Sequence, residues 1–263
     1  MDLERFLSDS PSAVGIICRF YEGSLSDVIT LAGNLLSQEK LPEPIVLGLV
    51  PTEFVGKDRL DALMQLLWTM TRSKLTRARV FPLLLSPPSS LYSELRESTR
   101  ALCTEEFQQQ YMEHWGTAEH MHRYCSINSY LHYYVTDVAY SELVTACDAC
   151  KYMLFTNADN LYAPDFLNSA IGAMSQQNSD LVVSSFVHRK EPLDAQVVVG
   201  KMDLGGVLVD RSLLDSSGMT FFKAVGDVLT PQNLHDADYW FVKSLQDMGA
   251  KIAFMTSFGF MHN

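Results

Sequence analysis

The chain has 263 residues, of which 47% are hydrophobic, and a formal net charge of −11. This length and composition can supply the core of one large domain or two small ones, so the chain is expected to fold as an ordinary globular protein. The negative charge argues against nucleic acid or an anionic membrane surface as a partner. A polyanionic ligand would therefore need a metal ion or a focused basic pocket.

The amino terminus and the cysteines indicate an intracellular protein. Residues 1–13, MDLERFLSDSPSA, carry acids and lack the basic region and apolar run of a secretory signal, and no apolar stretch is long enough for a membrane span. Five scattered cysteines are an odd number, which is typical of free thiols rather than of a disulfide framework. We expect a soluble, cytoplasmic protein in which Cys147 and Cys150 are packing thiols at a helix end.

Apolar runs alternate with amphipathic stretches along the first part of the chain. The patterns predict strands at residues 14–18, 45–50 and 80–85, and helices at 25–37 and 58–74. This β-α-β-α-β order indicates a parallel sheet with helices on both faces.

Residues 86–134 break the alternation, because they are rich in Gln, His, Tyr and Ser and contain a Pro-Pro pair near their start. We expect an insertion over the sheet edge. No repeat or linker divides the sequence, so residues 1–263 are expected to form a single mixed α/β domain with a mainly parallel central sheet. Beyond the insertion, the patterns predict helices at 135–146, 164–176 and 238–248, and strands near 152 and at 181–186, 207–209 and 252–255.

The segment KYMLFTNADNLYAP, residues 151–164, runs from an apolar strand directly into short oxygen-bearing side chains. The period-two alternation of a strand would place Asn157 and Asp159 on one face and Ala158 on the other. Ligands collect at the carboxyl ends of strands in open α/β sheets, and Asn and Asp oxygens suit a hard divalent cation. A simple polar turn before the next helix is the competing interpretation.

The order of motifs resembles the GT-A class of nucleotide-sugar-dependent glycosyltransferases, in particular family 2, over nearly the whole chain. The resemblance implies a single Rossmann-like GT-A domain and an inverting transfer from a UDP- or GDP-sugar to a glycan or other hydroxyl acceptor. Residues 86–134 would then be a lid or an acceptor wall. The resemblance depends on VGIICRFYEG (14–23), LVPTEF (49–54), YYVTDVAYSELV (133–144) with KYMLFTNADNLYAPDFL (151–167), HDADYWFVKSLQDMGAKI (235–252) and the terminal FMHN (260–263).

A divalent cation, Mn²⁺ or Mg²⁺, is implied by the resemblance, with Asp159, His262 and Asn157 as ligands. Such an ion would act as a Lewis acid on the leaving diphosphate. Asn157 replaces the first acid of the usual Asp-X-Asp motif, so it could instead bond a ribose hydroxyl or a metal-bound water, while Asn160 could orient Asp159. His262 would meet Asp159 only if the last strand returns to the same sheet edge, and a frayed chain end is its alternative interpretation.

The resemblance also implies a carboxylate base and a set of nucleotide contacts. Asp238, with Asp236 beside it, would take the proton from the acceptor hydroxyl, although either acid could simply cap a helix. The nucleotide contacts have ordinary alternatives in surface ion pairs, helix caps and tight turns. The donor-binding candidates are Arg19 for the diphosphate or base, Tyr21 for stacking, Glu53 near the nucleobase, Thr136 and Asp137 at a helix start, and Asp203 beside Gly205 and Gly206.

Two other functions remain open on the sequence. The neutral Asn157 and the missing Glu-Asp pair would also suit a catalytically weak nucleotide-sugar-binding protein. A sugar nucleotidyltransferase is less favoured, because no glycine-rich basic loop follows the first strand.

Overall fold

The computed structural model describes residues 2–8, 10–39, 43–53, 55–72, 79–85, 93, 104–115, 129–188, 190–199, 201–226 and 236–262. Its α-helices are α1 (Leu3–Leu7), α2 (Leu25–Leu36), α3 (Lys57–Thr71), α5 (Glu105–Trp115), α7 (Ser129–Ala146), α8 (Phe166–Gln177), α9 (Arg211–Ser217), α10 (Phe221–Val225) and α12 (Ala237–Asp247), and two short 3-10 helices are η1 (Glu22–Ser24) and η2 (Leu204–Gly206). The strands are β1 (Ala13–Phe20), β2 (Ile45–Pro51), β3 (Val80–Leu84), β4 (Cys150–Asn157), β5 (Leu161–Tyr162), β6 (Leu181–His188), β7 (Glu191–Leu193), β8 (Val207–Asp210) and β9 (Ile252–His262).

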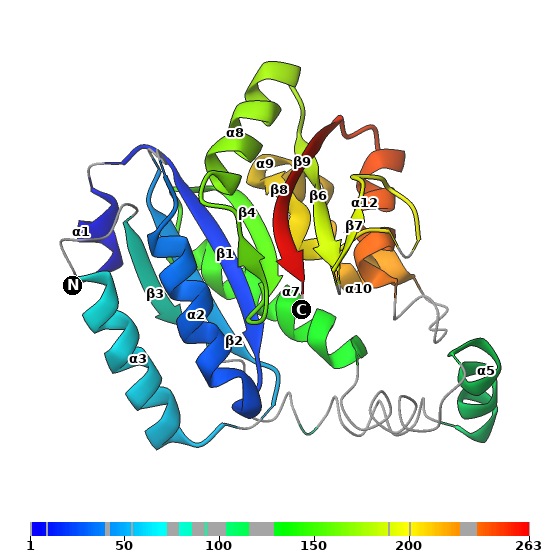
Figure 1. Ribbon diagram of the computed structural model, residues 1–263, viewed down its shortest axis with the longest axis horizontal. Coiled ribbons are helices and arrows are strands. Elements are labelled where there is room, and N and C mark those ends of the chain that lie inside the picture. Colours follow the sequence, from blue (N-terminus) through cyan, green and yellow to red (C-terminus); the bar gives the residue numbers. More distant parts are fainter. Residues whose placement is uncertain are drawn as a thin grey trace.

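Within the described residues the strands form one sheet in the order β3-β2-β1-β4-β8-β6-β9-β5, with β7 paired to β6 (Figure 1). Strands β3, β2, β1 and β4 are parallel neighbours, β8 is antiparallel to both β4 and β6, and β9 is parallel to β6. The carboxyl ends of β1, β4, β6 and β9 therefore lie at one edge. The predicted mixed, mainly parallel α/β sheet is confirmed.

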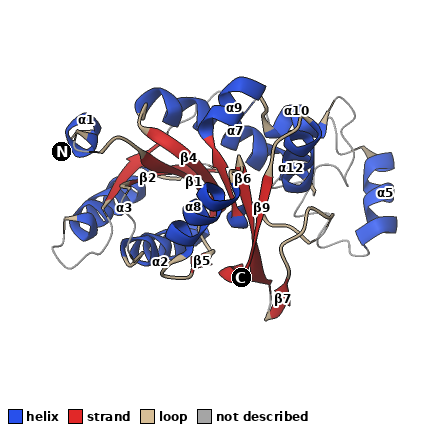
Figure 2. Ribbon diagram, turned by 90° about the horizontal axis from the view of Figure 1, so that it is seen from above, coloured by secondary structure: helices blue, strands red, loops and turns tan. Residues whose placement is uncertain are grey.

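Helices cover both faces of the sheet, with α2, α3 and α8 on one side and α7, α9, α10 and α12 on the other (Figure 2). The alternation along each strand feeds two apolar cores. In β1, Ile16 and Cys18 belong to the core under α2 and α3, while Ile17 belongs to the core under α7. Both cores hold fully buried aliphatic and aromatic side chains, which makes their burial the main source of stability.

Several predicted boundaries differ from the observed ones. Helix α7 begins at Ser129 rather than at residue 135, and β9 continues to His262 rather than ending at residue 255. The extension of β9 follows from its partner, because β6 pairs with it from Leu181 opposite Ile252 to His188 opposite His262. The predicted insertion lies mostly outside the described residues. Among those residues, no helix combines the length and apolar character needed to cross a membrane.

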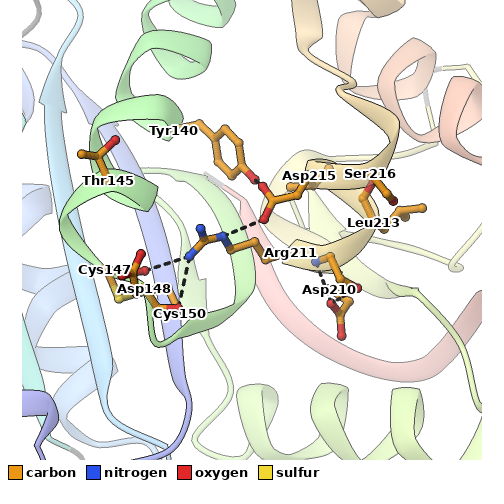
Figure 3. A network of polar contacts seen from close by, with 12 residues as sticks. Tyr140, Thr145, Cys147, Asp148, Cys150, Asp210, Arg211, Leu213, Asp215 and Ser216 are labelled. Carbon is orange, nitrogen blue, oxygen red and sulfur yellow. Dashed lines mark hydrogen bonds and ion pairs between the residues drawn. A yellow bond between two sulfur atoms is a disulfide. The ribbon is translucent and has the colours of Figure 1, made fainter.

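The expectation that Cys147 and Cys150 are free thiols is wrong. They form a disulfide that joins the end of α7 to the start of β4, with Cα atoms 5.4 Å apart (Figure 3). Cys18 is free and buried, and the two remaining cysteines lie outside the described residues. The short turn between helix and strand brings the two sulfurs together, which a count of scattered cysteines does not reveal.

Arg211 binds the exposed carbonyl oxygens at the carboxyl end of α7. Arg211 donates from Nη1 to the carbonyl oxygens of Cys147 and Asp148, at 3.0 and 3.3 Å, and from Nε to Asp215 at 3.1 Å (Figure 3). Tyr140 donates to the other Asp215 oxygen at 3.0 Å. A cation at a helix carboxyl terminus satisfies exposed carbonyls and opposes the negative end of the helix dipole. These contacts fix the carboxyl end of α7 against α9.

Candidate active site

Four strand ends bring polar side chains to the carboxyl edge of the sheet. Arg19 of β1 lies opposite Asn157 of β4, and His188 of β6 lies opposite His262 of β9. The two imidazole rings are 5.0 Å apart. Figure 1 shows β9 running beside β6 to this edge, where the carboxyl terminus is marked. Strand β9 thus brings the carboxyl-terminal part of the chain to the same edge of the sheet at which β4 ends.

Asp203 links η2 to the end of β9. One of its oxygens accepts a hydrogen bond from the Gly205 amide at 2.7 Å, and the other contacts Nδ1 of His262. Asp159 lies within the same electrostatic cluster, because burial raises its pKa, His262 lowers it and Asp203 raises it. His262 and Asp159 therefore interact electrostatically, and Asp203 contacts both the His262 ring and the Gly205 amide of η2.

Two acids stand at the start of α12. Asp236 occupies the N-cap position and is 4% exposed, and Asp238 follows in the first turn. Burial raises the pKa of Asp238 to about 7, and the charges of Asp203 and Asp236 act in the same direction. The Tyr239 amide, 2.8 Å away, and Arg19 lower it. Asp203 thus interacts with both Asp159 and Asp238, which places the predicted ion-binding and base residues in one cluster.

Arg19 is held between a strand neighbour and a helix. Its Nε donates to Oδ1 of Asn157 at 3.0 Å, and its guanidinium carbon lies 4.9 Å from the centroid of the Tyr133 ring. Tyr133 is on α7 and packs against Phe221 of α10 at 5.2 Å. Burial raises the pKa of Tyr133, the charges of Asp238 and Asp203 raise it further, and the charge of Arg19 and a hydrogen bond with Arg19 lower it, so this phenol interacts with the same acids.

Thr136 and Asp137 lie inside α7 rather than at its start, which corrects their predicted position. Thr136 is buried and donates to the carbonyl oxygen of His132 at 2.7 Å. Asp137 accepts hydrogen bonds from the amides of Phe221 and Phe222, at 2.9 and 3.0 Å, and so holds the first turn of α10. Burial raises the pKa of Asp137 to about 6. These contacts tie α7 to α10.

This anchoring predicts a stability difference between two Asp137 variants. Asp137→Ala is expected to lower the free energy of unfolding by about 1–2 kcal/mol at pH 7, because the amides of the buried Phe221 and the exposed Phe222 lose their acceptor. Asp137→Asn retains one acceptor oxygen and removes a charge that burial disfavours, so it should cost less than about 1 kcal/mol. Urea unfolding of both variants would measure the difference. Equal stabilities would show that the two amide contacts contribute nothing.

Tyr21 and Glu53 lie beside the ends of β1 and β2. Tyr21 is the N-cap residue of η1 and is 48% exposed, and Oε1 of Glu53 accepts a hydrogen bond from the Glu22 amide at 3.0 Å. The glutamate therefore fixes the turn that carries the tyrosine. The two residues predicted to contact the nucleobase therefore lie after the ends of the neighbouring strands β1 and β2.

The two glycines of η2 approach protein side chains closely. A Cβ atom on Gly205 would lie 2.4 Å from Nδ2 of Asn160, and one on Gly206 would lie 2.6 Å from the Phe260 ring. Asn160 donates to Oγ1 of Thr156 at 3.0 Å. The space that these glycines leave is thus filled by buried Asn160 and Phe260, and this packing sets the position of Asp203.

Tyr133 and His188 belong to the cluster although sequence reasoning missed them. Tyr133 falls within residues 86–134, which were expected to be an insertion, and His188 lies beyond the predicted strand end at residue 186. The extended pairing of β6 with β9 and the earlier start of α7 bring them to the site. A longer apolar pattern toward the start of α7, in LHYYV, is the signal that could have indicated the helix.

The side chains at this edge offer few ligands to a divalent cation. Within the described parts of the chain, no group of three or more His, Cys, Asp or Glu side chains is arranged to hold a metal ion. Asp159 and His262 interact electrostatically, whereas Oδ1 of Asn157 faces the Arg19 guanidinium. Mg²⁺ is often bound by one or two carboxylates together with substrate phosphates rather than by an all-protein cage. The described residues therefore supply two candidate ligands, Asp159 and His262, and the further ligands of a cation would have to come from a bound diphosphate.

No family model and no curated protein matches the chain. Solved structures do match it. TarS 1-349 from S. aureus has a TM-score of 0.55 with 10% identity over 95% of this chain, and its UDP complex has a TM-score of 0.56. The mannosyltransferase PcManGT from Pyrobaculum calidifontis, in complex with GDP-Man and Mn²⁺, has a TM-score of 0.54 with 13% identity over 98% of this chain.

The chain spans about 60% of the length of these chains, namely 60% of TarS 1-349 and 61% of PcManGT. At such low identity the likeness concerns the fold. It extends over nearly all of the present chain and agrees with the mixed sheet, its strand order and the helices on both faces. The protein therefore has a GT-A glycosyltransferase fold.

Proposed function

We propose that the protein is a glycosyltransferase that moves a sugar from a UDP- or GDP-sugar to a hydroxyl acceptor, with inversion. The observation that supports the proposal is that Asp203, which contacts His262, interacts electrostatically with both Asp159 and Asp238. A donor diphosphate beside Asp159 would then have its reacting sugar carbon near Asp238. The neighbours that bind UDP, UDP-GlcNAc or GDP-Man support this choice of donor.

Asp238 would act as the general base. A desolvated carboxylate with a pKa of about 7 is well matched to proton transfer near neutral pH. It would accept the acceptor hydroxyl proton as that oxygen bonds to the sugar carbon and the bond from this carbon to the diphosphate breaks. Asp236, buried next to it, would keep the pKa of Asp238 high.

Asp159 and His262 would hold a Mn²⁺ or Mg²⁺ ion. When bound, such an ion supplies positive charge to the oxygens of the leaving diphosphate. A hydrogen bond from Nδ1 of His262 to Asp203 would fix the tautomer in which Nε2 carries the lone pair that a metal ion binds, as carboxylates commonly do behind metal-binding histidines. Asp203 would thus orient the imidazole instead of binding a sugar hydroxyl. Tyr21 and Glu53 remain our candidates for the nucleobase.

Donor turnover tests the proposal. The full chain should release UDP from UDP-GlcNAc, or GDP from GDP-mannose, faster with Mn²⁺ than with EDTA, and chromatography of the nucleotide products would measure it. Formation of a nucleoside triphosphate in the presence of pyrophosphate would indicate a nucleotidyltransferase instead. Binding without turnover, across a panel of hydroxyl acceptors, would indicate a nucleotide-sugar-binding protein. Either result would overturn the proposed transfer.

A further inference from the structure

The Arg19 guanidinium is a permanent positive charge built into the end of β1. We infer that Arg19, held by Asn157 and Tyr133, binds the diphosphate of the donor directly, so that a nucleoside diphosphate binds this protein without a divalent ion. The inference rests on the proposed function and deepens it. It also gives Asn157 a different role, that of a positioning residue for Arg19 rather than a metal ligand.

The backbone directs the side chain of Arg19 to the site. Arg19 lies opposite Asn157 in the parallel β1-β4 pair, at the carboxyl edge where ligands bind in open α/β sheets. Strand alternation puts it on the same face as Ile17, which belongs to the core under α7. The contact with Tyr133 of α7 agrees with this direction. Arg19 is only 9% exposed, so its position is set by the fold.

The charge of Arg19 has little local compensation. Among the ion pairs of the described residues, none joins Arg19 to a carboxylate within 4.0 Å. Its close contacts are a neutral amide oxygen and the ring and hydroxyl of Tyr133, none of them charged, and it affects Asp238 only as an electrostatic neighbour. A buried cation is costly unless a counter-charge approaches it. A diphosphate would supply that charge and accept from the Nη groups, since only Nε is bonded to Asn157.

This arrangement explains why an asparagine stands at the first position of the Asp-X-Asp pattern. An aspartate at residue 157 would form a buried ion pair with Arg19 and neutralise it. Asn157 accepts the same Nε hydrogen bond without adding charge, so the guanidinium is oriented and stays available to an anion. A divalent ion bound to Oδ1 of Asn157 would instead lie against the guanidinium and be repelled.

Tyr133 is the second residue, after Asn157, that fixes the position of Arg19. Its ring lies beneath the guanidinium and is itself packed against Phe221, whose amide is bonded to Asp137. An arginine stacked on an aromatic face keeps a defined plane and loses little rotamer freedom when it binds an anion. Both the ring face and the phenol hydroxyl contact Arg19. Tyr133→Leu should therefore weaken the function of Arg19, and Tyr133→Phe, which keeps the ring face, should weaken it less.

The test is calorimetric titration of UDP and of GDP into the full chain, in EDTA and in Mn²⁺. The wild type should bind one of them in EDTA. Arg19→Met should weaken that binding by about 10- to 100-fold, as expected for loss of charged hydrogen bonds. Asn157→Asp should weaken it similarly by neutralising Arg19, and it should increase the ratio of Mn²⁺ to EDTA affinity. The matched control is Arg72→Met, which changes an exposed arginine at the C-cap of α3 that lies over Trp68 and should bind as the wild type does.

The outcomes separate this inference from the proposed function. Binding of UDP or GDP by the wild type only with Mn²⁺ would overturn the role of Arg19 and leave the glycosyltransferase proposal standing. Undiminished EDTA binding by both Arg19→Met and Asn157→Asp would also overturn it. No binding of either nucleotide under any condition would overturn both proposals. Because Asn157→Asp preserves shape, it remains informative if Arg19→Met fails to fold.

Discussion

Asp238→Asn is expected to lower the rate of sugar transfer about 1000-fold at pH 8, because a general base contributes roughly 10²- to 10⁴-fold and an amide cannot accept the proton. The same substitution should raise the free energy of unfolding at pH 8 by about 2 kcal/mol, roughly half of what the full pKa change would give, because the Asp238 side chain is only half-buried. Burial and two neighbouring acids raise the pKa of Asp238 from 3.8 to about 7, so its charged form opposes folding. Transfer rates and urea unfolding would measure the two effects.

The pH dependence of these effects has a defined sign. Between about pH 4 and 7 the folded protein holds a proton on Asp238 that the unfolded chain has released, so this group makes stability fall as pH rises through that window. Activity should rise over the upper part of the same window, as the base becomes charged. Asp238→Asn should remove both trends.

A control variant shows whether the loss of any acid from α12 has the same effects. Asp247→Asn removes an exposed carboxylate of the same helix, paired with Lys243, and should change transfer and stability little. An Asp238→Asn variant that is less stable than the wild type at pH 8, or that retains most of its transfer rate, would contradict the assignment of the base.

The fold and part of the site follow from local patterns. Short apolar runs separated by amphipathic stretches indicated the parallel strands, and the polar residues after β4 indicated the edge at which Asn157 and Asp159 lie. These inferences hold because strand alternation and helix periodicity are local properties of the chain. The strand edge is where a parallel sheet presents its side chains to a ligand.

The remaining features depend on pairing between distant segments. His262 reaches the site because β9 pairs with β6 beyond residue 255, and no local pattern records where a strand stops pairing. Asp203 contacts His262 because Gly205 and Gly206 admit Asn160 and Phe260, which is a packing relation between three segments. The Arg19 to Asn157 contact likewise requires the register of β1 and β4. Sequence spacing cannot supply such registers.

Asp159→Ala is expected to reduce sugar transfer at least about 100-fold and to abolish any increase in thermal stability caused by Mn²⁺. The reason is that Asp159 is the proposed carboxylate ligand, and His262 alone would hold the ion weakly. Burial raises the pKa of Asp159, so loss of this carboxylate should not destabilise the protein without metal. Thermal unfolding with and without Mn²⁺, at a fixed UDP or GDP concentration, would measure the coupling.

The Asp159 and Arg19 variants should lose different ligands. Asp159→Ala should leave UDP or GDP binding in EDTA intact, whereas Arg19→Met should remove that binding and keep a response to Mn²⁺. The increase in thermal stability caused by Mn²⁺ should be smaller in Asp203→Asn than in the wild type and larger than in Asp159→Ala. Asp203→Asn weakens the orientation of His262 without removing a ligand. Asp58→Ala, at an exposed acid on α3, should match the wild type. If Asp159→Ala kept the full Mn²⁺ response, the ion would bind elsewhere, and the leaving diphosphate would have to be stabilised by Arg19 without help from Asp159.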